Sequence, residues 1–99
     1  MRTDAAQSLR VIIFREADQW LAQGLERDIA VQAENLRDIV NRLSLAIDAE
    51  IAMESFAALG PAPKYFQDLW GPRAGEYTPS APIALSGAPN LNITLGLAI

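Results

Sequence analysis

The chain has 99 residues, of which 51% are apolar and 20% charged, and it contains neither cysteine nor histidine. A chain of this length is expected to form one domain. The lack of cysteine excludes disulfides, zinc–thiolate sites, iron–sulfur clusters and thiol nucleophiles. The lack of histidine removes the usual general base near neutral pH and the commonest transition-metal ligand. We therefore expect no enzyme activity, no metal site and no cofactor.

The net charge of −4 is concentrated in the first half, because residues 1–54 contain ten acids and six bases while residues 55–99 contain two of each. Autonomous nucleic-acid binding needs a basic surface that displaces counterions from phosphates, and no basic stretch is present. A basic protein is the better electrostatic partner. No apolar segment has the length of a signal peptide core or a membrane span, so we expect a cytoplasmic protein without membrane contact.

The first half of the chain predicts three short strands. Residues 9–14 (LRVIIF) are β-branched and aromatic, with apolar side chains on both faces of the strand. Residues 20–25 and 29–33 are two further apolar segments, each reached through a short polar turn. Strands joined by such short connections form an antiparallel meander.

A helix with one buried stripe follows the strands. Its apolar residues recur at spacings of three and four: Leu36, Ile39, Val40, Leu43, Ile47 and Ile51. Asn35 is the expected N-cap, because its side-chain oxygen can accept from an unpaired amide of the first turn. Asp38 and Arg42 are expected to pair at i,i+4, and the helix is expected to end near Ser55.

All six prolines and five of the six glycines follow residue 59. Residues 64–70 predict a short helix whose Phe66, Leu69 and Trp70 share one face, and residues 73–89 predict a loop. Residues 90–99 alternate strictly and predict a half-buried strand. The domain 1–99 thus divides into a core (8–55), a connector that contains the short helix (56–89) and a C-terminal strand (90–99).

The C-terminal strand leaves an alternative open. Within one chain it would complete the sheet, whereas exchanged between subunits it would tie together a homo-oligomer, a dimer or larger. In the second case its apolar face forms the oligomer interface, through Leu91, Ile93, Leu95 and Leu97.

The order of elements and four sequence segments resemble the HicB-like antitoxin family. The segments are VIIF at 11–14, WLAQGLE at 20–26, DIAVQA at 28–33 and NLRDIVNRL at 35–43, so the resemblance covers about residues 9–51. It implies an α+β fold, a three-stranded antiparallel meander on one long helix, described in the family as partial RNase H-like. It also implies that the chain neutralises a small basic ribonuclease of the HicA type.

Two departures from the family pattern affect what is implied. Ala30 and Ala33 stand where the family usually has glycine, which argues against left-handed backbone at either position. Residues after 55 have no basic DNA-binding segment of the kind that many members use to repress their own operon. We therefore expect a single-domain, HicB-like chain that does not repress transcription alone.

The candidate partner-binding residues lie mainly in the predicted turns. Glu16, Asp18, Glu26 and Asp28 are expected to form an acidic surface near one end of the sheet, which would cover a basic active face. Trp70 is expected at the interface and Trp20 in the core. Five acids are weighed as metal ligands and are disfavoured, because no predicted strand carries an inward-facing acid: Asp18, Glu26, Asp28, Glu34 and Asp48. The rival interpretation is a self-assembling structural domain that has no toxin partner.

Overall fold

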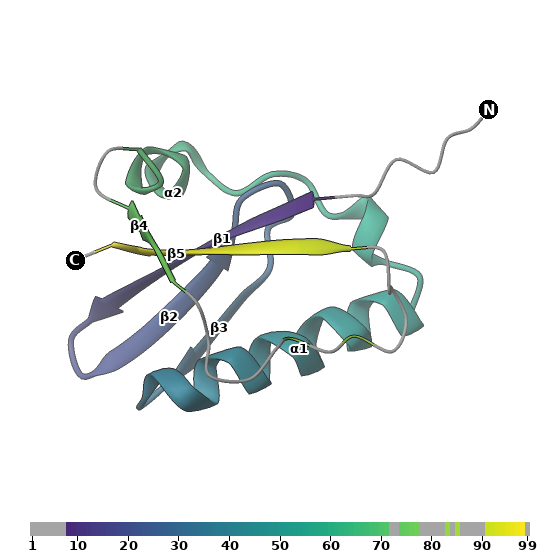
Figure 1. Cartoon of the computed structure of the whole chain (residues 1–99). Coiled ribbons are helices and arrows are strands. Elements are labelled where there is room, and N and C mark those ends of the chain that lie inside the picture. Colours follow the sequence, from purple (N-terminus) through teal and green to yellow (C-terminus); the bar gives the residue numbers. More distant parts are fainter. Residues whose placement is uncertain (1–7, 72–73, 78–82, 84, 86–90, 99) are drawn as a thin grey trace.

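The protein has an α+β fold in which a mixed five-stranded sheet lies between a long helix and a short one (Figure 1). The computed structural model describes residues 8–71, 74–77, 83, 85 and 91–98. The elements in chain order are β1 (Ser8–Glu16), β2 (Gln19–Gly24), β3 (Ala30–Ala33), α1 (Leu36–Ala52), the 3-10 helix η1 (Phe56–Ala58), α2 (Lys64–Leu69), β4 (Ala74–Glu76) and β5 (Asn92–Ala98).

The strand order is β3-β2-β1-β5-β4, with β1 at the centre. β1, β2 and β3 form the predicted antiparallel meander. β5 joins β1 in parallel, so that Leu95 lies beside Val11 within the same chain. The prediction of a loop over residues 73–89 is wrong at β4, which pairs antiparallel with β5. The remainder of that stretch lies outside the described residues, except Tyr77, Ile83 and Leu85.

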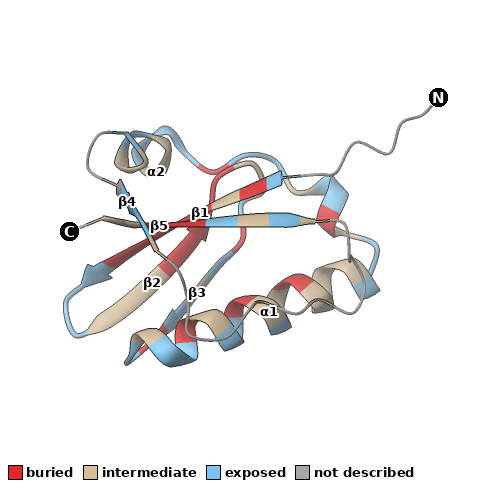
Figure 2. Ribbon diagram, viewed as in Figure 1, coloured by how far each residue is buried: buried red, intermediate tan, exposed pale blue. Residues whose placement is uncertain are grey.

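Two apolar layers cover the two faces of the sheet. Figure 2 shows that buried residues gather in β1, β2 and α1. On one face, Leu9, Val11 and Ile13 of β1 pack against the buried stripe of α1, which consists of Ile39, Leu43 and Ile47. On the other face, Ile12 and Phe14 pack with Leu25 and with the half-buried Phe66, Leu69 and Trp70. Successive side chains of β1 point to opposite faces of the sheet, and apolar side chains stand on both. Both faces of β1 are therefore buried, as the sequence predicts.

The start of α1 agrees with the prediction, because the Asn35 side chain accepts from the Asp38 amide at 3.0 Å. The predicted end near Ser55 is three residues too far. Glu54 has a φ of 58°, and the Ser55 amide donates back to the Glu50 carbonyl at 2.9 Å. This left-handed residue and the backward hydrogen bond close the last turn at Ala52.

Side-chain contacts around α1 differ from the prediction in one respect. Asp38 and Arg42 form no ion pair with each other. Instead, Arg42 Nη1 donates to the Gln32 carbonyl at 2.8 Å, and Asp38 Oδ2 accepts from Asn35 Nδ2 at 3.2 Å. Arg42 reaches β3 because its side chain lies on the flank of α1 above that strand.

Backbone geometry at the turns depends on specific residues. Ala17, in the two-residue β1–β2 connection, has a φ of 55°, whereas Ala30 and Ala33 avoid the left-handed region as predicted. A Cβ atom at Gly24 would lie 2.6 Å from the Arg27 carbonyl oxygen. Glycine at position 24 is therefore what allows the chain to turn sharply from β2 toward β3.

Candidate functional site

The four acids predicted to form one surface lie at opposite ends of the sheet. Glu16 ends β1 and Asp18 lies in the β1–β2 connection, whereas Glu26 and Asp28 lie in the β2–β3 connection. Successive turns of an antiparallel meander alternate between the two ends, and this separates the pairs. The prediction of a single acidic cluster made of these residues is therefore wrong.

The Glu26 carboxylate is bound within the chain. Glu26 Oε1 accepts from the Arg10 amide at 2.7 Å, and Oε2 pairs with Arg10 Nε. Partial burial raises the pKa of Glu26, but the hydrogen bonds from Arg10 outweigh it and leave the pKa below 4.5, the ordinary value for glutamate. Glu26 is thus ionised at neutral pH and serves to hold the β2–β3 connection on β1.

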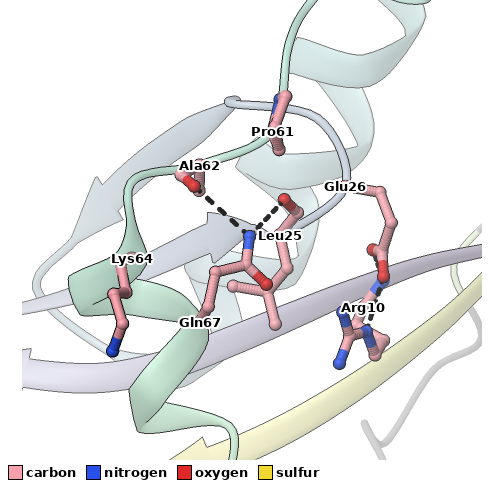
Figure 3. Close-up of a pocket in the computed structure, with 7 residues that line it drawn as sticks. All are labelled: Arg10, Leu25, Glu26, Pro61, Ala62, Lys64 and Gln67. Atoms are coloured by element: carbon pink, nitrogen blue, oxygen red, sulfur yellow. Dashed lines mark hydrogen bonds and ion pairs between the residues drawn. The ribbon is translucent and has the colours of Figure 1, made fainter.

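A shallow pocket of about 440 Å³ lies beside this ion pair (Figure 3). Its lining comes from β1, the β2–β3 connection, the segment before α2 and α2 itself: Arg10, Leu25, Glu26, Pro61, Ala62, Lys64 and Gln67. Gln67 Nε2 donates to the carbonyl oxygens of Leu25 and Ala62, at 2.8 and 3.3 Å. Because these polar groups bind one another, the pocket presents mainly an apolar surface to a ligand.

The same region is tied together by the main chain. The Asp28 amide donates to the Gly60 carbonyl at 2.7 Å, and the Ala62 amide donates to the Leu25 carbonyl at 3.0 Å. Arg27 Nη1 reaches the carbonyl oxygens of Ala57 and Leu59, both at 2.9 Å. Asp28 Oδ1 accepts from Gln23 Nε2 at 2.9 Å. Both acids of this turn are therefore engaged inside the fold.

Trp70 is half-buried against the sheet. A Cβ atom at Gly96 would lie 2.6 Å from Trp70 Cζ3, so the ring occupies the space above this glycine of β5. Arg10 belongs to β1, the strand next to β5, and its guanidinium lies 5.6 Å from the Trp70 ring centroid. These contacts give Trp70 a packing role, and its role as a partner contact stays a prediction.

At the hairpin end of the sheet, three exposed acids come from two turns. Glu16 ends β1, and Asp18 lies in the β1–β2 connection. Glu34 follows β3, whose last residue Ala33 pairs with Trp20. Trp20 packs half-buried against the α1-side core, as predicted, and the Arg15 guanidinium lies 5.3 Å from its ring centroid. Glu34 is not among the residues predicted to bind a partner. The alternation of turns along the meander is the signal that would have placed it there.

The C-terminal residues expected at an oligomer interface lie against the chain's own core. Leu95 is 4% exposed. Leu91, Ile93 and Leu97 are half-buried and pack on the α1-side layer. The expected surface of apolar side chains is thus covered, because β5 pairs with β1 and turns its apolar face toward α1.

Within the described residues, no three acids form a group that could hold a metal ion, and no helix is long and apolar enough to cross a membrane. Comparison of the chain with protein-family models, with curated proteins and with solved structures finds no match.

Proposed function

We propose that this chain is a non-catalytic protein-interaction module that resembles HicB-like antitoxins and neutralises a small basic ribonuclease of the HicA type. The residues that carry the resemblance lie on β1, β2, β3 and α1, which pack as one continuous unit. Neutralisation is steric and electrostatic: the module covers the basic active face of the ribonuclease and keeps RNA away from it.

The observation that supports this proposal is the set of exposed acids at the hairpin end of the sheet. Glu16, Asp18 and Glu34 lie there on two neighbouring turns, beside the half-buried Trp20. An acidic surface attracts a basic protein from a distance and raises the association rate. The tryptophan ring adds apolar area of the kind found at the centre of interfaces. Glu26 and Asp28 are omitted, because their carboxylates are bound to Arg10 and Gln23.

The test searches the genes next to this one for a small basic protein. With that protein purified, binding is measured by titration calorimetry and RNA cleavage with a fluorescent substrate. We expect stoichiometric inhibition. The double variant Asp18→Lys, Glu34→Lys should weaken binding by about tenfold or more, chiefly through slower association that depends on salt.

The matched control is Glu54→Lys, Glu76→Lys, which changes the net charge by the same amount at exposed positions away from the hairpin. It should bind with nearly the original affinity. Equal effects of the two double variants would contradict the assignment of the surface, and undiminished RNA cleavage by the saturated ribonuclease would contradict the function.

A self-assembling domain without a toxin is the second candidate, favoured by the outer edge of β3, which no described strand covers. The same titration separates the two candidates, because the second predicts no binding of any neighbouring basic ribonuclease.

A further inference from the structure

β3 forms one margin of the sheet, and no strand in the described part of the chain lies beyond it. The Gly24 amide donates to the Ile29 carbonyl at 2.8 Å, so the antiparallel alternation directs the polar backbone groups of Val31 and Ala33 toward β2. The amides and carbonyls of Ala30 and Gln32 therefore point outward. Both side chains are exposed and uncharged, so β3 lacks the charges with which edge strands usually resist pairing.

The flank of α1 above this edge carries a second stripe of side chains. The hydrogen bond from Arg42 to the Gln32 carbonyl identifies the flank. Positions 38, 42, 45 and 49 follow one another at spacings of four and three, so Asp38, Arg42, Leu45 and Ala49 share it. All four are exposed, and Leu45 retains 65% of its accessible surface. This stripe is separate from the buried one that faces the sheet.

The charges on the flank are self-complementary. Asp38 and Arg42 are one helical turn apart, carry opposite charges and do not pair with each other in the chain. When two copies of α1 lie antiparallel about a two-fold axis, Asp38 of each copy faces Arg42 of the other. We propose that the β3–α1 edge, defined as Ala30–Ala33 with Asp38, Arg42 and Leu45, pairs with the same surface of a second copy of this chain.

Pairing of two copies gives hydrogen-bond partners to the backbone groups that point outward from the β3 edge of the single chain. The outward amides and carbonyls of Ala30 and Gln32 bond to the second β3 and extend the sheet across the axis. Arg42 releases the Gln32 carbonyl to the neighbouring strand and turns to Asp38 of the other copy. Leu45, one turn beyond Arg42, adds apolar contact. The inference depends on this surface and not on the proposed neutralisation, and it gives an interface to the self-assembly that the second candidate function requires.

Sedimentation equilibrium of the purified chain alone, over a series of concentrations, tests the proposal. We expect the mass of two chains. Asp38→Arg should raise the dissociation constant by about tenfold, because two like-charged pairs replace two opposite ones. The double variant Asp38→Arg, Arg42→Asp should restore the original value, since the swapped charges still face each other. Ala30→Pro should also weaken the dimer, because proline removes an outward amide that the edge can spare within one chain.

Arg37→Asp is the matched control, since Arg37 is exposed on α1 but lies off the flank. Far-UV circular dichroism checks each variant for folding, and Gln32→Lys replaces Ala30→Pro if the proline variant unfolds. A single-chain mass at every concentration would overturn the proposal. So would a dimer that Asp38→Arg weakens no more than Arg37→Asp does, or one whose charge-swapped double variant stays dissociated. Because no ribonuclease is present, failure here leaves the proposed neutralisation untouched.

Discussion

Glu26 shows how one side chain can hold two strands in register. Its carboxylate accepts from both the backbone and the guanidinium of Arg10, and it thereby fixes the turn after β2 against the start of β1. The cost of partial burial is outweighed by these bonds, so the pKa of Glu26 is lowered in the folded chain. A contact of this kind connects folding to pH.

The sign of this dependence follows from the lowered pKa. As the pH falls, the unfolded chain binds a proton at Glu26 before the folded chain does, so stability is lost as the pH falls through the folded value. We expect Glu26→Gln to reduce the free energy of unfolding at pH 7 and to have less effect below pH 4.5. Urea unfolding at the two pH values measures both effects. The same substitution at the exposed Glu16 is the control, and an equal, pH-independent loss at Glu26 would contradict the linkage.

Among the elements, α2 depends most on its neighbours. It has six residues and none of them is buried, so its isolated sequence would not hold a helix. Phe66, Leu69 and Trp70 dock it on the sheet, and Trp70 fits only because position 96 has no side chain. The sequence shows the shared face of the three apolar residues, but it does not show which glycine receives the ring.

Gly96→Ala should therefore displace α2. We expect a loss of about 1–3 kcal/mol of unfolding free energy, because the added methyl group overlaps the Trp70 ring. Gly75→Ala, in the adjacent strand, is the matched control, since an added Cβ there meets no atom within 4 Å. Urea unfolding with tryptophan fluorescence measures both variants. Equal stability of the two variants would show that the Trp70 ring moves aside without loss of unfolding free energy.

For the complete fold, the decisive contact is the parallel pairing of β5 with β1. β1 is central and buried on both faces. β5 pairs with the edge of β1 that the meander of β1, β2 and β3 leaves unpaired. Leu95 extends the α1-side core from β5, whereas its neighbour Thr94 is exposed on the other face. The last strand is thus part of the core and not an addition to a finished domain.

Leu95→Ala should cost about 2–5 kcal/mol of unfolding free energy, the range for buried leucine truncation. Thr94→Ala should cost much less, because exposed positions contribute little. Thermal and urea unfolding of both variants provide the comparison. If Leu95→Ala were as stable as Thr94→Ala, β5 would not contribute to the core as described.

The candidate site was only partly predictable. Exposure of Glu16 and Asp18 follows from their position at and in the tight β1–β2 connection, which the polar residues 16–19 indicate. Their separation from Glu26 and Asp28, and the place of Glu34 at the same end of the sheet, follow from the alternation of turns in the predicted meander. By contrast, the sequence predicts a pair between Arg42 and Asp38 along α1, whereas Arg42 donates to the Gln32 carbonyl on β3. No local pattern indicates this contact.

Local patterns in the sequence were enough to predict the three strands of the meander, the body of α1 and its Asn35 cap. These features depend on residues close together in the chain, where side-chain alternation and hydrogen bonding of the first turn act directly. Tertiary structure alone decided that β5 joins β1 and that β4 exists. Both outcomes depend on contacts between segments far apart in the chain, and such contacts are decided by packing rather than by local preference.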